Sequence, residues 1–111
     1  QFKCKYTPYP FLPFIGRKSC TLKIEENCIN IKFDKEPHLR HHFNFYDIEK
    51  VLLLNESVVI RHKIGEDFMG RSKCKNYSYE FNDLRFAINI FNTLCNKLNQ
   101  EYVTVRNLLV N

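Results

Sequence analysis

The last quarter of the chain, from Lys75 to Val105, constrains the fold more than any other segment. Tyr77, Tyr79 and Phe81 alternate with polar residues, a period of two that indicates a strand with one buried face. Asn82–Asp83 then offers a helix N-cap, and the period changes to three and four, which predicts an amphipathic helix over residues 82–102. Its apolar stripe contains Leu84, Ala87, Ile88, Phe91, Leu94, Cys95, Leu98 and Tyr102. Only a sheet or another helix can cover such a stripe.

The segments before this helix indicate a sheet, because short runs alternate between apolar and polar residues. Strands are predicted to begin near Phe2, Cys20, Ile29, His42, Val51 and Val58, and the seventh is the aromatic strand described above. Turns are predicted at 26–27 and 55–56, a Pro-rich loop over 9–16, and a second loop over 34–38. Residues 64–75 have no clean period and predict a long loop or an irregular edge. Residues 103–110 predict a short strand or an extended tail.

The size and composition fit one globular domain that covers residues 1–111. The chain is 44% hydrophobic and 26% charged, and 111 residues suffice for one core. Its formal net charge of +5 permits an acidic partner such as phosphate, anionic lipid or an acidic peptide. The basic residues are scattered along the sequence, however, and this distribution is more typical of an ordinary solvated surface.

The residues that could carry chemistry form no convincing catalytic or metal site. The five cysteines are odd in number and lack CxxC spacing, so they are predicted to be reduced thiols, mostly packed in the core. Of these, Cys74 has basic neighbours in sequence and could be a reactive surface thiol. In the His38–His42 segment, His41 and His42 would point to opposite faces of a strand, which disfavours a shared metal. The sequence therefore predicts a protein that is not an enzyme and has no cofactor, with no signal peptide or membrane span.

Seven antiparallel strands followed by one C-terminal helix resemble the pleckstrin-homology (PH) fold. The resemblance covers nearly the whole chain and is carried by the step Phe45–Ile48 and by the aromatic strand that leads into the helix. It implies an α+β architecture, in which an antiparallel sheet of about seven strands forms a sandwich or barrel capped by the helix.

One function that PH domains carry out is binding of phosphoinositides through basic residues of the first hairpin. In the comparable region this chain has Lys5, Arg17, Lys18 and Lys23, although the neighbouring bases Arg17 and Lys18 do not alternate and a final Arg is missing. The aromatic loop with Phe11 and Phe14 could dip into a bilayer interface, or it could cap the open end of the sheet. This resemblance implies the alternative function, a module that binds anionic lipid at a cytoplasmic membrane surface.

A narrower resemblance involves the segment from Ile60 to Val105. The runs Ile60–Lys63, Asp67–Met69, Arg71–Lys75 and Tyr77–Phe81, followed by the helix and then Tyr102–Val105, resemble a meiotic PH-like domain. That domain is the N-terminal domain of the Rec subunit of the Rec–Mei–Mer complex, which supports programmed DNA double-strand breaks. The resemblance implies a non-enzymatic docking or scaffold domain at nuclear chromosomes. Gly65–Asp67 interrupts the apolar part of the pattern.

If the domain docks onto a partner in this way, its binding surface is predicted to lie around the irregular segment 64–75. The predicted partner-binding residues are Arg61, Lys63, Phe68, Met69 and Tyr77, because apolar groups flanked by bases suit an acidic and hydrophobic segment of a protein partner. Packing of Phe68 and Met69 within the loop is an equally open interpretation. The bases in the same region form only a modest cluster, and binding to DNA needs several phosphate contacts from one face. Contact of this domain with DNA is therefore predicted to be weak or absent.

Overall fold

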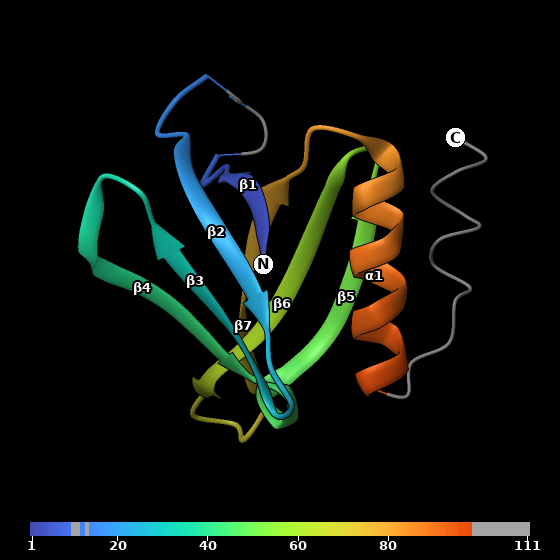
Figure 1. Ribbon diagram of the computed structural model, residues 1–111. Coiled ribbons are helices and arrows are strands. Elements are labelled where there is room, and N and C mark those ends of the chain that lie inside the picture. Colours follow the sequence, from blue (N-terminus) through green and yellow to red (C-terminus); the bar gives the residue numbers. More distant parts are fainter. Residues whose placement is uncertain (10–11, 13, 99–111) are drawn as a thin grey trace.

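The computed structural model describes residues 1–9, 12 and 14–98 of the chain (Figure 1). In that part, seven strands precede one α-helix. The strands are β1 (Phe2–Tyr6), β2 (Lys18–Ile24), β3 (Cys28–Phe33), β4 (Glu36–Asn44), β5 (Ile48–Leu54), β6 (Ser57–Glu66) and β7 (Ser72–Glu80). A short 3-10 helix, Phe45–Asp47, joins β4 to β5, and helix α1 spans Leu84–Leu98.

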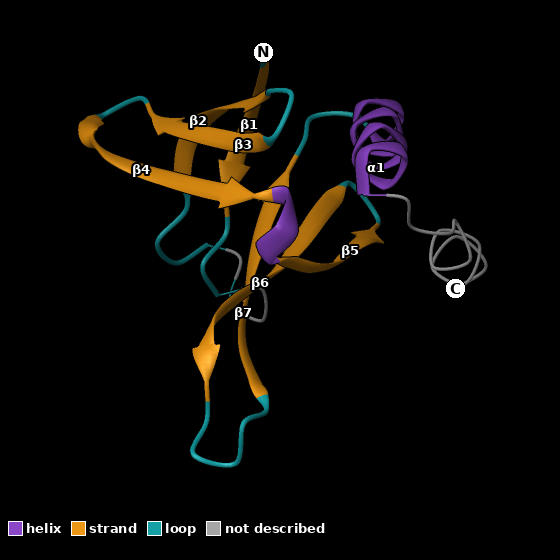
Figure 2. Ribbon diagram, turned by 90° about the horizontal axis from the view of Figure 1, so that it is seen from below, coloured by secondary structure: helices purple, strands orange, loops and turns teal. Residues whose placement is uncertain are grey.

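All seven strands belong to one antiparallel sheet with the order β4-β3-β2-β1-β7-β6-β5. Strand β1 joins the two halves of the sheet, and it pairs with β7 only at Lys5↔Glu80 and Tyr6↔Tyr79. The sheet bends at this junction, so that β1–β4 and β5–β7 form two layers (Figure 2). In the described part of the chain, seven antiparallel strands and a single helix after them confirm the predicted PH-like α+β sandwich.

The core lies between the inner faces of the two layers and is closed by the helix (Figure 1). Alternate strand residues supply it, as the period of two requires. Helix α1 buries the central part of the predicted stripe and also Ile90, whereas Leu84 at its start stays exposed. The fully buried side chains of largest volume are Tyr79, Phe43, Phe91, Leu22, Ile29, Ile31, Leu53, Ile60, Ile90, Leu94, Val51 and Val58.

The helix begins where the sequence predicted. The Asp83 carboxylate accepts a hydrogen bond from the backbone N–H of Arg85 at 2.8 Å, which satisfies one of the unpaired amides of the first turn. Within the described residues α1 ends at Leu98, so the predicted continuation to 102 and the tail at 103–110 lie outside them.

Two predicted loops were wrong in their bounds. The loop assigned to 34–38 is a two-residue turn, and β4 already begins at Glu36. Pro37 is tolerated there because β4 is an edge strand of the sheet, where a missing N–H breaks no ladder. The irregular segment assigned to 64–75 is mostly paired: β6 continues to Glu66 and β7 starts at Ser72.

Candidate docking surface

Strands β6 and β7 form a hairpin that projects beyond the body of the sheet (Figure 2). Their register runs from Ser57↔Glu80 to Glu66↔Ser72, with an irregularity at Ile64 that explains why the sequence showed no clean period. Strand β5 follows β6 only as far as His62. Among the described residues, the distal part of the hairpin therefore has no further strand on either side.

Asp67 shapes the turn at the end of this hairpin. Its Oδ1 accepts hydrogen bonds from the backbone N–H groups of Met69 and Arg71, both at 2.9 Å. Its Oδ2 lies 3.2 Å from Nε of Arg71 in an ion pair. Gly70 supplies the positive φ of 79° that the turn requires. The sequence Asp-x-x-Gly is a turn signal that could have located this hairpin.

The turn leaves large apolar side chains in solvent. Phe68 is 97% exposed, Met69 65% and Ile64 57%. We call these three residues the hairpin tip. Packing of Phe68 and Met69 within their own loop was one interpretation of the sequence. The exposure of Phe68 contradicts it, whereas the Met69 sulfur contacts Arg71 of the same turn at 3.6 Å. Ile64 was not among the predicted binding residues, because its bulged position cannot be seen from the sequence.

The predicted binding residues Arg61 and Lys63 lie along the same hairpin, on the opposite face from the predicted Tyr77. Arg61 is held by Glu49, 3.2 Å from its Nε, and by Asn76, while Lys63 is exposed nearer the tip. Tyr77 is half-buried on the inner face, with its ring 4.9 Å from that of Phe43. The structure thus brings Lys63, Phe68 and Met69 to one end of the hairpin and places Tyr77 in the aromatic core.

Cys74 has an acidic neighbour that sequence proximity did not reveal. Its thiol donates a hydrogen bond to Oε2 of Glu49 at 2.8 Å, and this bond raises the pKa of Cys74. The same bond lowers the pKa of Glu49. A thiol with a raised pKa is a poor nucleophile near neutral pH, so the geometry argues against a reactive Cys74.

The first basic pair of the predicted lipid site is engaged by carboxylates. Arg17 forms an ion pair with Glu80, and Lys18 forms one with Glu36 at 2.9 Å. Both bases line a hollow of about 300 Å³ between the start of β2 and the β3–β4 turn, together with Lys35. In this arrangement Arg17 and Lys18 have little unbalanced charge to offer a phosphate.

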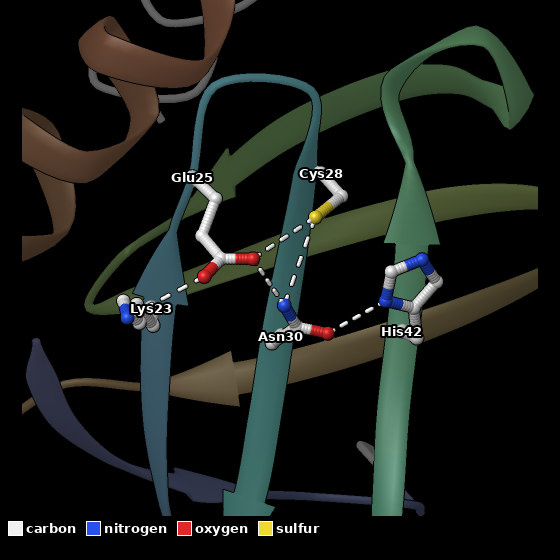
Figure 3. A network of polar contacts seen from close by, with 5 residues as sticks. All are labelled: Lys23, Glu25, Cys28, Asn30 and His42. Atoms are coloured by element: carbon white, nitrogen blue, oxygen red, sulfur yellow. Dashed lines mark hydrogen bonds and ion pairs between the residues drawn. The ribbon is translucent and has the colours of Figure 1, made fainter.

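Lys23 lies far from this pair, at the opposite end of β2. It belongs to a polar network on the β2–β3 hairpin (Figure 3). Glu25 forms an ion pair with Lys23 at 3.4 Å and accepts hydrogen bonds from Cys28 at 3.2 Å and Asn30 at 2.6 Å. Asn30 also contacts His42 at 2.6 Å. The network links three strands and gives Lys23 a structural role.

Of the two aromatic residues predicted to contact lipid, the structure describes only Phe14. Phe11 lies outside the described residues. Phe14 is 89% exposed in the segment between β1 and β2. Figure 1 places that segment at the opposite end of the molecule from the β6–β7 turn.

The histidines diverge as the sequence predicted. His41 points into the core, where its Nδ1 contacts the Tyr79 hydroxyl at 2.7 Å, whereas His42 contacts Asn30 on the outer face. In the described part of the chain no three His, Cys, Asp or Glu residues are placed to hold a metal ion. None of its helices is long and apolar enough to cross a membrane.

A basic face, of which sequence analysis identified only Lys5 and Lys23, covers the outside of β1–β4. The register places Lys3, Thr21, Lys32 and Arg40 side by side across all four strands. Lys5 and Lys23 lie on the same face, since they alternate with the buried residues of their strands. The bases come from strands far apart in sequence, and only the pairing register brings them together.

Comparison with known proteins identifies the architecture. No protein-family model matches the chain, and no curated protein matches it. Among solved structures, it is similar to inner membrane complex sub-compartment protein 3 from Toxoplasma gondii, with a TM-score of 0.62 and 19% sequence identity. The match covers 87% of this chain and 73% of that chain. The likeness shows the fold. It agrees with a PH-like domain and carries no assignment of partner or ligand.

Proposed function

We propose that this PH-like domain is a non-enzymatic docking module that binds an acidic and apolar segment of a protein partner through its hairpin tip. The observation that carries the proposal is the 97% exposure of Phe68 at the end of a projecting hairpin. Phe68, Met69 and Ile64 form an apolar group that the fold itself leaves uncovered, and such groups mark interaction sites.

Charge around the tip favours an acidic partner. Between residues 63 and 75 the chain has four bases, Lys63, Arg71, Lys73 and Lys75, against the two acids Glu66 and Asp67. Asp67 is already neutralised by Arg71. An incoming segment with acidic and apolar side chains can therefore pair with the lysines while it covers Phe68.

The backbone of the hairpin offers a mode of attachment. Residues Lys63–Glu66 of β6 extend beyond the end of β5, and residues Ser72–Asn76 of β7 extend beyond the pairing with β1. Their outer edges have free hydrogen-bonding groups in the described structure. A partner segment can add as a strand to one of these edges and place alternate side chains against the tip.

The test is capture of partners from extract of the native cells with the tagged domain and its variants. Phe68→Asp and Lys73→Glu are expected to lose the captured protein. Phe14→Asp is the matched control, because Phe14 is 89% exposed but lies in another loop. Equal capture by wild type, Phe68→Asp and Lys73→Glu, with circular dichroism unchanged, would refute the site.

The nuclear and chromosomal setting belongs to the same proposal and is supported by the sequence resemblance of residues 60–81 and 102–105 alone. Imaging of the tagged protein in its native cells tests it. Association with meiotic chromosomes would support the setting, and a purely membrane-associated signal would count against it.

The second candidate function is binding to an anionic membrane surface, and the basic face of β1–β4 favours it. Lys5, Lys32 and Arg40 have no carboxylate partner among the described residues, unlike Arg17, Lys18 and Lys23. Sedimentation with phosphatidylserine vesicles separates the candidates. Loss of binding in Lys32→Glu/Arg40→Glu, but not in Arg17→Glu/Lys18→Glu, would place a lipid site on this face. No sedimentation of the wild type would remove the lipid function.

A further inference from the structure

Cys4 and Cys20 face each other across the first two strands of the sheet. They are direct partners in the β1–β2 register, and their sulfur atoms lie 3.3 Å apart. Both side chains are buried, with exposures of 6% and 0%. All five cysteines of the chain are free thiols in this structure. The pair therefore brings two thiols into contact within the core.

The backbone geometry at this pair suits a disulfide bond. Directly opposed residues of antiparallel strands have Cα atoms about 4.5–5.5 Å apart. A disulfide accepts Cα separations of about 4.4–6.8 Å. The two sulfurs can therefore be joined by small side-chain movements, without displacement of either strand.

The two sulfurs are also chemically unequal. The hydrogen bond between the two sulfurs, in which either atom can donate, lowers the pKa of Cys20 and raises the pKa of Cys4. Cys20 is thus the sulfur that ionises first, and the thiolate is the nucleophilic form of cysteine. Cys4 remains a thiol held in contact with it. This asymmetry suits a reaction in which one sulfur is oxidised and the other resolves the product.

We propose that Cys4 and Cys20 are a reversible disulfide site that is oxidised by peroxide. In the first step the Cys20 thiolate attacks one oxygen of hydrogen peroxide. An S–O bond forms, the O–O bond breaks, and the released hydroxide takes up the proton lost by Cys20 to give water. In the second step the Cys4 sulfur attacks the Cys20 sulfenic sulfur. An S–S bond forms, and the hydroxide that leaves takes the Cys4 proton as a second water.

Access to the pair is compatible with a small oxidant. A depression in the surface is lined by Lys3, Cys4, Lys5, Ser19, Cys20, Asp34 and Asn82. Hydrogen peroxide is little larger than water and can approach through local opening of this strand pair. Larger disulfide oxidants are expected to react more slowly, because both sulfurs are buried.

The bond would lock the N-terminal strand to the body of the sheet. Strand β1 has only two paired residues with β7, so its position depends mainly on β2. The disulfide would also close residues 5–19, which include Phe14, into a covalent loop. A cross-link over a loop of this length restricts the unfolded chain and is expected to raise the melting temperature by about 5–15 °C.

The experiment treats the purified chain with hydrogen peroxide and maps its thiols. Non-reducing peptide mass spectrometry is expected to find a Cys4–Cys20 cross-linked peptide that has lost two hydrogens, and thiol titration in denaturant is expected to fall from five to three. Cys28→Ser/Cys74→Ser should behave in the same way, except for its lower starting number, because it retains the pair. Dithiothreitol should restore the thiols and the original melting temperature.

The variants keep the test decisive. Cys4→Ala and Cys20→Ala should lack both the cross-link and the rise in melting temperature on oxidation. Wild-type mass mapping alone decides the proposal if either variant fails to fold. Recovery of Cys4 and Cys20 as free thiols, as sulfinic acids or linked to other cysteines would overturn it.

Discussion

The hydroxyl of Tyr79 lies 2.7 Å from Nδ1 of His41, inside a cluster of aromatic rings. Tyr79 is fully buried, and the rings of Tyr6, Phe33 and Tyr77 lie 4.7, 4.8 and 5.0 Å from that of His41. Burial lowers the pKa of His41 to about 4, with further contributions from the cations Lys75 and Lys18. The imidazole is therefore neutral in the folded protein at neutral pH.

This arrangement predicts that the domain loses stability in mild acid. An unfolded histidine titrates near pH 6.5, so between pH 6.5 and 4 the unfolded chain binds a proton that the folded chain does not. The His41 contribution is fully present above pH 6.5 and is lost as the pH falls towards 4. After allowance for its partial exposure, we expect about 1–2 kcal/mol.

Urea unfolding at pH 7 and pH 4.5 measures this change. His41→Phe should flatten the dependence on pH, and a residual slope is expected from His62, whose pKa is also lowered by burial. His42→Gln is the matched control, because His42 lies on the opposite face of the strand, outside the core. An unchanged slope in His41→Phe would contradict the assignment.

The helix cap gives a second prediction. Asp83→Ala removes the carboxylate that accepts the Arg85 N–H, so the first turn of α1 loses a capping bond. We expect the melting temperature to fall by about 2–6 °C. Asp83→Asn keeps an acceptor and should retain most of the stability. If Asp83→Ala has the same melting temperature as the wild type, the cap makes no measurable contribution to stability.

The sequence predicted the fold better than it predicted the site. Local periodicity is enough to find α1 and all seven strands, because each buries one face. Local periodicity does not reveal which residues of neighbouring strands pair. For this reason the basic residues Lys3, Lys32 and Arg40 were interpreted as scattered. The bulge at Ile64 adds one residue to β6 and so reverses the alternation of apolar and polar residues along the strand. The sequence therefore did not show that the hairpin continues to the exposed Phe68. The contact of Cys74 with Glu49 joins residues 25 positions apart and leaves no local signal.

The turn at the hairpin tip gives a third prediction. Gly70 has a φ of 79°, where a β-branched side chain is strained, while Asn is tolerated. In the described structure, a Cβ at this position would have no atom within 4 Å apart from its immediate neighbours, so the effect should come from the backbone alone. Gly70→Val is expected to cost about 1–2 kcal/mol locally. Gly70→Asn should cost less.

Amide hydrogen exchange can localise this effect. Faster exchange is expected in Gly70→Val at 63–66 and 72–75, with the core strands unchanged, because the distal hairpin has no neighbouring strand in the described structure. Equal exchange rates at 63–66 and 72–75 in wild type, Gly70→Val and Gly70→Asn would show that the turn does not determine how well the hairpin tip is ordered.

The cover formed by α1 gives the last prediction. Phe91 and Leu94 are fully buried against the sheet, so Phe91→Asp or Leu94→Asp places a charge in the core without a partner and should unfold the domain. Leu94→Ala is the graded version and should cost about 2–5 kcal/mol in the free energy of unfolding. Asn89→Asp introduces the same charge on the exposed face of the same helix and should leave the fold intact. Circular dichroism with thermal melting compares the four variants. Full stability of Leu94→Asp would mean that α1 does not close the core, and the assignment of the PH-like fold to this sequence would fail with it.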